Sequence, residues 1–152
     1  MSRISRTGPS TASADTIATS LLTIQTSGRG FVDLTAEATN FVGEAGAKQG
    51  TMTLFIRHTS ASLTIQENAD PSVLDDLTTA LGRLAPENAG WSHDTEGPDD
   101  MPAHVRAALT AVHISIPLSA GRLALGTWQG IYLWEHRLRR HRREVALHLL
   151  GS

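Results

Sequence analysis

Short β-type segments dominate this sequence, and most of the stretches that separate them are too short to hold a helix. β-branched residues recur between positions 17 and 26, and apolar residues alternate with other residues at 51–58 and 143–150. Alternation with a period of two is typical of strands that bury one face. Neighbouring parallel strands need a crossover connection of about a dozen residues or more. The short connections therefore predict mainly antiparallel sheets.

Helix signals are fewer than strand signals, and they fall at three places in the chain. Asp70-Pro71 supplies an acidic N-cap followed by a proline at the first helical position, and leucines at helical spacing continue as far as Pro86. Thr35 begins a second helix that ends near Gly46. Pro102 begins a third, through residue 109. Further strands are predicted at residues 31–34, 62–67, 112–118, 122–125 and 131–135.

About seven strands interrupted by two or three helices indicate an α+β fold of β-sandwich-like, mainly antiparallel sheets. A length of 152 residues fits one domain. We expect residues 1–14, rich in Ser, Thr, Arg and Pro, to be a disordered lead-in, and residues 15–152 to form the domain. The lead-in has no apolar stretch typical of a signal peptide, and no run is long enough to span a bilayer, so we predict a cytoplasmic protein that does not enter membranes.

Composition narrows the possible chemistry. A formal charge of −2 argues against a dedicated nucleic-acid binder. The chain has no cysteine, which excludes disulfides, thiolate metal sites and cysteine nucleophiles. Histidine, aspartate and glutamate are left as the strong metal ligands.

A loop from His93 to His104 holds four carboxylates between its two histidines. So many like charges in one loop repel each other unless a positive charge lies among them, and imidazole and carboxylate are both common metal ligands. The spacing of the histidines matches neither a metalloprotease helix nor a zinc finger. The loop is therefore either a cation site or an acidic surface loop that faces water.

Two other segments have the composition of ligand-binding turns. Residues 57–63 (RHTSASL) place hydroxyl and small residues directly after a strand, which suits phosphate oxygens but also an ordinary turn. In the segment 126–130 (GTWQG), Trp128 could stack on a flat ring while Gln129 contacts its edge. Alternatively, Trp128 fills the core.

Charge stands out in two further places. Glu135 lies in an otherwise apolar segment, where a carboxylate needs a partner such as a metal, Arg or His. Arginines 137, 139, 140, 142 and 143 form a basic run between two strands. The simplest interpretation of this run is a solvated hairpin turn; RNA or phosphate binding is the alternative.

Three long motifs, in this order, resemble the YjbQ-like family, also called the secondary thiamine-phosphate synthase family. They are residues 58–71 (HTSASLTIQENADP), residues 93–104 (HDTEGPDDMPAH) and residues 121–133 (GRLALGTWQGIYL) with Glu135. The similarity extends from about residue 14 to residue 150. It implies a small α+β fold assembled as a homotrimer, with a polar pocket near the subunit contacts. The activity attributed to the family is a weak condensation of hydroxymethylpyrimidine diphosphate with thiazole phosphate.

The resemblance also implies roles for individual residues. His58, His93 and His104 are the implied ligands of a divalent metal ion, Zn²⁺ or Mg²⁺. Glu96 and Glu135, with Asp99, are implied further ligands or side chains that orient the imidazoles, and the two glutamates are the candidate catalytic groups. From their residue types within these motifs, Ser60, Ser62 and Asn68 are candidates to bind phosphate oxygens, and Trp128 and Gln129 are candidates to bind the aromatic ring of a substrate.

Three functions remain open on the sequence. The first is a metal-dependent enzyme that acts on phosphorylated small molecules, with thiamine-phosphate synthesis as its activity. The second is a metal-dependent hydrolase that uses the same site. The third is a non-enzymatic trimer that binds a metabolite.

Overall fold

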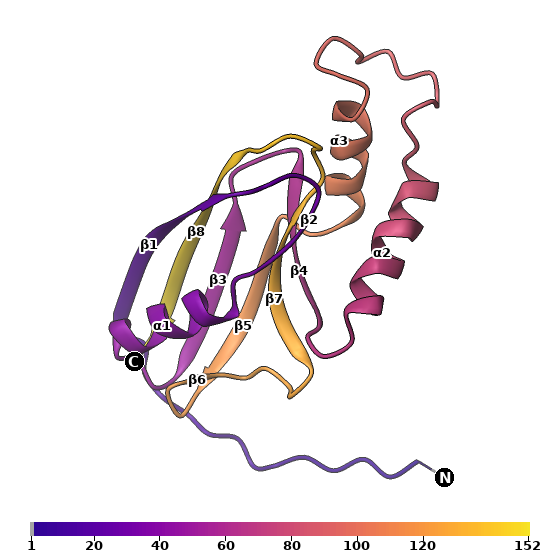
Figure 1. The fold of residues 1–152 in the computed structure, drawn as a ribbon. Helices are drawn as coiled ribbons and strands as arrows, with labels where there is room; N and C mark the ends of the chain where they lie inside the picture. The colour runs from indigo at the N-terminus through magenta and orange to yellow at the C-terminus, as the bar shows by residue number, and fades with distance from the viewer. Residues whose placement is uncertain (1) are drawn as a thin grey trace.

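Two antiparallel sheets form the body of the protein in the computed structural model, which describes residues 2–152 (Figure 1). One has five strands in the order β1-β8-β3-β5-β6, and the other has three in the order β2-β7-β4. The strands are β1 (Thr16–Gln25), β2 (Gly30–Asp33), β3 (Gly50–Ile56), β4 (Ala61–Glu67), β5 (His113–Ser119), β6 (Arg122–Leu123), β7 (Gln129–Glu135) and β8 (Arg142–Gly151). The helices are α1 (Thr35–Ala45), α2 (Pro71–Leu84) and α3 (Asp100–Leu109). The predicted α+β fold is confirmed.

The hydrophobic core lies between the two sheets and is closed by α1. Alternate residues of the central strands point into it, among them Met52 and Leu54 of β3 and Leu147 of β8. Leu133 of β7 meets them from the three-stranded sheet, and Phe41 adds the apolar face of α1. Helices α2 and α3 lie beside β4 on the other side of the three-stranded sheet (Figure 1).

Two of the three helices begin and end where their cap signals predict. Asp70 caps α2, and its side chain accepts a hydrogen bond of 2.9 Å from the backbone N–H of Ser72. Gly46 ends α1 in the left-handed conformation, with φ at 70°, and its N–H donates to the carbonyl of Val42.

The third helix begins two residues before the predicted start. Helix α3 starts at Asp100, so Pro102 lies in its first turn, where its missing N–H is not needed by the helix. Asp99 holds the N-cap position, but its side chain makes no capping hydrogen bond. The Asp99 carboxylate instead accepts hydrogen bonds from Arg137 and from the backbone N–H of Leu138.

Two further predictions need correction. The strand expected at 122–125 is shorter, because β6 pairs with β5 only through Arg122 and Leu123. The basic run is not a fully solvated turn. Arg139 and Arg140 are exposed, but Arg143 lies inside β8 with only 3% of its surface accessible.

The N-terminal segment lacks regular secondary structure. Residues 2–15 form no helix or strand, and residues 10–14 lie against Gly50 and Gly151. Among the described residues, no helix is both long and apolar enough to cross a membrane.

Candidate functional site

A cluster of two imidazoles and one carboxylate lies at the start of α3. The Nε2 atom of His93 is 2.7 Å from Oδ2 of Asp100, and the Nε2 atom of His104 is 3.3 Å from the same oxygen. One ligand atom from each of the three residues lies within 4.8 Å of the others. Asp100 and His104 are four residues apart on the helix, so they share one face, and the preceding loop brings in His93.

His104 is oriented as a metal-binding histidine usually is. Nδ1 of His104 donates a hydrogen bond of 2.9 Å to the carbonyl of Thr59, which points Nε2 into the cluster toward Asp100. The hydrogen bond with Asp100 raises the pKa of His93, because the carboxylate favours the protonated ring. A divalent cation would replace that proton and balance the same carboxylate. The cluster therefore fits a metal, and two nitrogen ligands favour Zn²⁺ over Mg²⁺.

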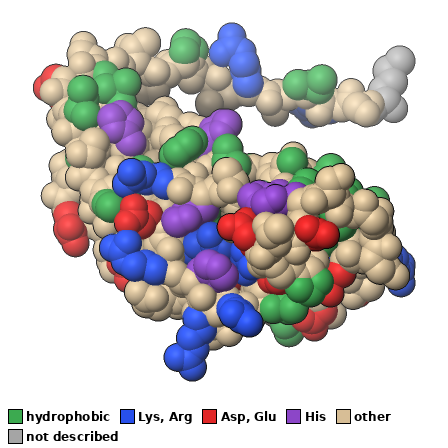
Figure 2. Space-filling view, turned by 90° about the horizontal axis from the view of Figure 1, so that it is seen from above, with side chains coloured by type: hydrophobic (Ala, Val, Ile, Leu, Met, Phe, Trp, Pro, Cys, Tyr) green, Lys and Arg blue, Asp and Glu red, His purple; other side chains and the backbone are tan. Residues whose placement is uncertain are grey.

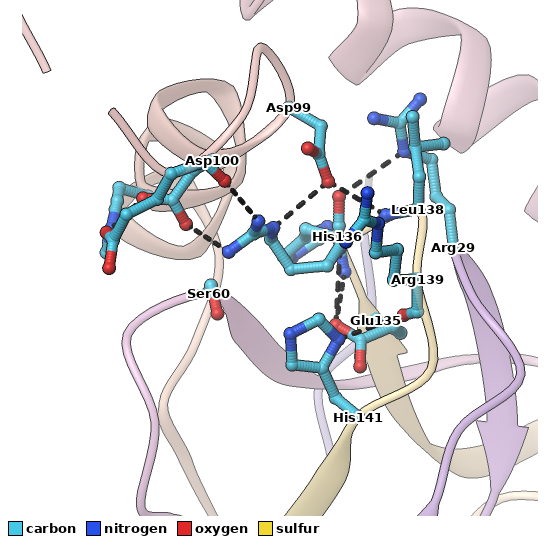
Figure 3. A network of polar contacts seen from close by, with 12 residues as sticks. Arg29, Ser60, Asp99, Asp100, Glu135, His136, Leu138, Arg139 and His141 are labelled. Atoms are coloured by element: carbon cyan, nitrogen blue, oxygen red, sulfur yellow. Dashed lines mark hydrogen bonds and ion pairs between the residues drawn. The ribbon is translucent and has the colours of Figure 1, made fainter. Parts of the chain in front are cut away.

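Arg137 joins the loop before α3 to the turn between β7 and β8. Figure 3 shows the network of polar contacts around Asp99, Asp100 and Leu138. Nε of Arg137 donates to Oδ2 of Asp99 at 3.0 Å, its Nη1 donates to Oδ1 of Asp100, and its Nη2 donates to the carbonyl of Glu96 at 2.8 Å. Burial alone would raise the pKa of Asp99, but hydrogen bonds from Leu138 N–H and Arg137 outweigh it and keep that pKa low. Together these contacts neutralise part of the charge that the sequence places in the loop.

His58 lies outside this cluster. Its Nε2 accepts a hydrogen bond of 2.8 Å from the backbone N–H of Glu144. Burial and the neighbouring Arg143 lower the pKa of His58, so the neutral ring that accepts this bond is favoured. Of the three histidines implied as metal ligands, the structure brings together His93 and His104, and Asp100 completes the group. Metal binding by His58 stays a prediction.

Glu135 is completely buried, and both of its oxygens are engaged. Arg143 donates to both of them, Thr26 donates to Oε1 at 2.7 Å, and the backbone N–H groups of His136 and Arg137 donate to Oε2. Although burial raises the pKa of Glu135, these bonds, that of Arg143 first, bring it below its usual value. The expected partner of this carboxylate is thus an arginine, and the ion pair joins β7 to β8.

The two serines implied in phosphate binding also have partners inside the protein. Oγ of Ser60 accepts a hydrogen bond of 3.0 Å from Arg143. Oγ of Ser62 lies 2.8 Å from Nε2 of His136, and both of these residues are fully buried. Both hydroxyl groups are therefore engaged in contacts inside the protein at the start of β4.

The remaining implied substrate residues lie at the opposite end of β4 and β7. Ala61 pairs with Glu135 at one end of the ladder, and Glu67 pairs with Gln129 at the other, a separation of about 20 Å along the strand. Asn68 donates to the carbonyl of Thr127, and Gln129 accepts from Gly126 N–H at 2.8 Å. The side chain of Trp128 is exposed and does not fill the core.

Glu96 is the implied catalytic residue closest to the cluster. Its Oε2 lies 3.1 Å from Nε2 of His93, and its side chain is largely exposed. A hollow of about 440 Å³ lies beside it, lined by Glu96, Asp99, Arg137 and Arg139 among others. Figure 2 shows histidine side chains gathered with basic and acidic ones on this end of the molecule.

Two residues of the site, Asp100 and Arg137, were not singled out from the sequence. The spacing of Asp100 and His104 signals one helix face, but only if the helix begins before Pro102. The position of Arg137 in the basic run gives no indication that it contacts a loop about forty residues earlier.

The sequence is similar to proteins of the UPF0047 YjbQ-like group. The family model described as "UPF0047 protein YjbQ-like" matches residues 20–152. A UPF0047 protein of Synechocystis is 52% identical over 133 residues, covering 87% of this chain and 90% of that protein. The UPF0047 protein YjbQ of Salmonella typhimurium is 41% identical and covers 86% of this chain and 96% of its own length.

Solved structures show the same fold. An uncharacterized conserved protein of the YjbQ/UPF0047 family from Clostridium acetobutylicum superposes with a TM-score of 0.79 at 35% identity, covering 85% of this chain and 98% of that one. A hypothetical protein from Aeropyrum pernix gives a TM-score of 0.81 at 27% identity, covering 89% and 99%.

Proposed function

The chain belongs to the UPF0047 YjbQ-like family. We propose that it is a metal-dependent enzyme acting on phosphorylated small molecules. The observation that supports this most directly is the convergence of His93, Asp100 and His104, whose ligand atoms lie within 4.8 Å of one another. Three protein ligands leave further positions on a cation free for water or substrate, as catalytic zinc sites do.

The proposed reaction needs a positive charge to balance the negative charge of phosphorylated substrates. A bound divalent cation would neutralise the phosphate oxygens of a substrate and the charge that grows on a leaving group. Thr59 keeps Nε2 of His104 pointed into the cluster. Glu96, exposed and next to His93, is placed to accept a proton from an incoming group.

Metal analysis tests the site itself. Purified protein dialysed against Zn²⁺ and then against metal-free buffer should retain one ion per chain by elemental analysis, and Asp100→Asn and His104→Ala should retain far less. The matched control is Asp76→Asn, an exposed aspartate on α2 that should leave the stoichiometry unchanged. Full retention in both site variants would contradict the proposed cluster. His58→Ala in the same series decides whether that histidine contributes.

The activity that the family resemblance implies is thiamine-phosphate synthesis, a transferase reaction. Protein loaded with metal and supplied with hydroxymethylpyrimidine diphosphate and thiazole phosphate should form thiamine phosphate, and His104→Ala should not. Release of inorganic phosphate or diphosphate without the condensed product would favour a hydrolase. Stabilisation by either substrate without turnover would favour a trimer that binds a metabolite.

Assembly as a homotrimer belongs to the same proposal. Trp128 and Gln129 lie about 20 Å along the strand from Ser60. In one chain the two groups cannot contact one small substrate, so a joint role requires a second copy. A cytoplasmic location stays a prediction.

A further inference from the structure

We propose that Arg137 is a positioning residue that keeps Asp100 a one-oxygen ligand of the metal. The proposal rests on the metal site put forward above and concerns a different side chain. It also gives a role to the first arginine of the basic run.

The two oxygens of Asp100 face opposite ways. Oδ2 lies 2.7 Å from His93 and 3.3 Å from His104, inside the cluster. Oδ1 accepts a hydrogen bond from Nη1 of Arg137, outside it. The side chain of Asp100 is only 4% exposed, so water has little access to replace that donor. With Oδ1 occupied, only Oδ2 is available to a cation.

Arg137 is itself held in place by two other contacts. Nε donates to Asp99 and Nη2 donates to the carbonyl of Glu96, so three of its nitrogens have separate acceptors. The rigid, planar guanidinium can satisfy three directions at once, which an ammonium group cannot do with the same geometry. Its side chain is 15% exposed. These contacts fix Nη1 relative to the carboxylate.

The number of oxygens that Asp100 supplies decides how many positions on the metal stay open. A carboxylate can bind through one oxygen or both. If Oδ1 were released, a small rotation would let Asp100 bind through both, and one position otherwise open to a phosphate oxygen would be filled. Arg137 therefore protects a substrate position without touching the metal or the substrate.

Cobalt(II) is a suitable probe because its visible absorption changes with coordination number. Wild-type protein loaded with Co²⁺ should show a spectrum that shifts on addition of inorganic phosphate. In Arg137→Gln we expect Co²⁺ still to bind at one per chain, with a weaker visible band and at least a tenfold loss of the phosphate response. Arg140→Gln removes the same charge from an exposed position of the same turn, outside the lining of the hollow beside Glu96, and should behave as wild type.

The outcomes separate the two proposals. Failure of the wild type to bind Co²⁺ would overturn the metal site and this inference with it. A spectrum and phosphate response in Arg137→Gln identical to those of the wild type would overturn only the role of Arg137. If Arg137→Gln does not fold, Asp99→Ala removes the acceptor that holds Nε and should give the same change. An unchanged response in Asp99→Ala would then overturn the inference.

Discussion

At the residue scale, His136 shows how strongly burial controls charge in this protein. The ring is fully buried between Ser62 and Trp134. Burial, together with the Arg106 guanidinium, lowers the pKa of His136 to about 3. The folded protein therefore keeps this ring neutral at a pH where the unfolded chain, with a pKa near 6.5, binds a proton.

Because of this difference in pKa, the wild type becomes less stable as pH decreases. Between pH 6.5 and pH 3 the unfolded state binds the extra proton, so the free energy of unfolding falls by about 1.4 kcal/mol per pH unit as pH decreases, or about 2 kcal/mol from pH 6.5 to pH 5. His136→Gln should remove this contribution. Urea unfolding of both proteins with a chelator, from pH 5 to 7.5, measures it. Parallel pH profiles would show that His136 does not contribute.

The buried pair of Glu135 and Arg143 carries the second prediction at this scale. Glu135→Gln removes the charge but leaves Arg143, only 3% exposed, without a carboxylate partner. We expect a loss of about 3–5 kcal/mol in unfolding free energy. Replacing both residues with Met should recover a large part of it, because no unpaired charge is then buried. A Glu135→Gln protein that is as stable as wild type but inactive would instead support a catalytic role for Glu135.

The sequence showed which residues were chemically unusual but not which partners they would find. A lone glutamate among apolar residues predicted a charged partner, and Arg143 is that partner. Which arginine of the basic run would be buried depended on the β7–β8 turn, and no local pattern reports that. In the same way, the resemblance predicted that His93 and His104 lie close together, but it gave no indication of Asp100, the carboxylate between them.

At the scale of elements, caps and alternation predicted most of the secondary structure. Helices α1 and α2 follow their cap residues, and the long strands follow their alternating pattern. Helix α3 begins two residues before its predicted start, because proline is tolerated in the first turn and Pro102 therefore did not mark the first helical residue. Asp99 would ordinarily cap the helix with its side chain, but that side chain binds Arg137 and Leu138 instead. Local signals fail where two distant segments compete for one group.

Two glycines, Gly50 of β3 and Gly43 of α1, should respond in opposite ways to an added methyl group. Gly50 at the start of β3 has φ of 146°, and an added Cβ would clash with the carbonyl oxygen of Leu150. Gly50→Ala should therefore lower the melting temperature and weaken the pairing of β3 with β8. Gly43→Ala is the matched control, since its Cβ would meet nothing within 4 Å inside a helix. It should raise stability by about 0.5–1 kcal/mol. Equal effects of the two substitutions would contradict this account.

At the scale of the whole molecule, the outer face of the five-stranded sheet is open and free of charge at its centre, and its charged residues Arg57, Arg142 and Glu144 lie together beyond Phe55 at one end. Two rows of apolar side chains cross this face. In one row, Ile17 of β1 is the cross-strand partner of Leu150 of β8. In the other, Ala146 of β8 lies between its partners Leu21 of β1 and Phe55 of β3. Among the described residues of these strands, the outward positions between these rows hold Thr, Ser and His rather than Asp, Glu, Lys or Arg. Ile17 is 68% exposed and Phe55 47% exposed. A face of this kind is typical of a contact between copies of a chain.

We predict that this face carries the trimer contact. Light scattering during size-exclusion chromatography should give three times the mass of 16.3 kDa for the wild type and one for Phe55→Glu, because each contact would bury a charge without a partner. Leu84→Glu is the matched control, an exposed leucine at the end of α2, and should keep the wild-type mass. A monomeric wild type would contradict the trimer. A trimeric Phe55→Glu protein would place the contact elsewhere, and the two groups of implied substrate residues would then have to meet through another surface.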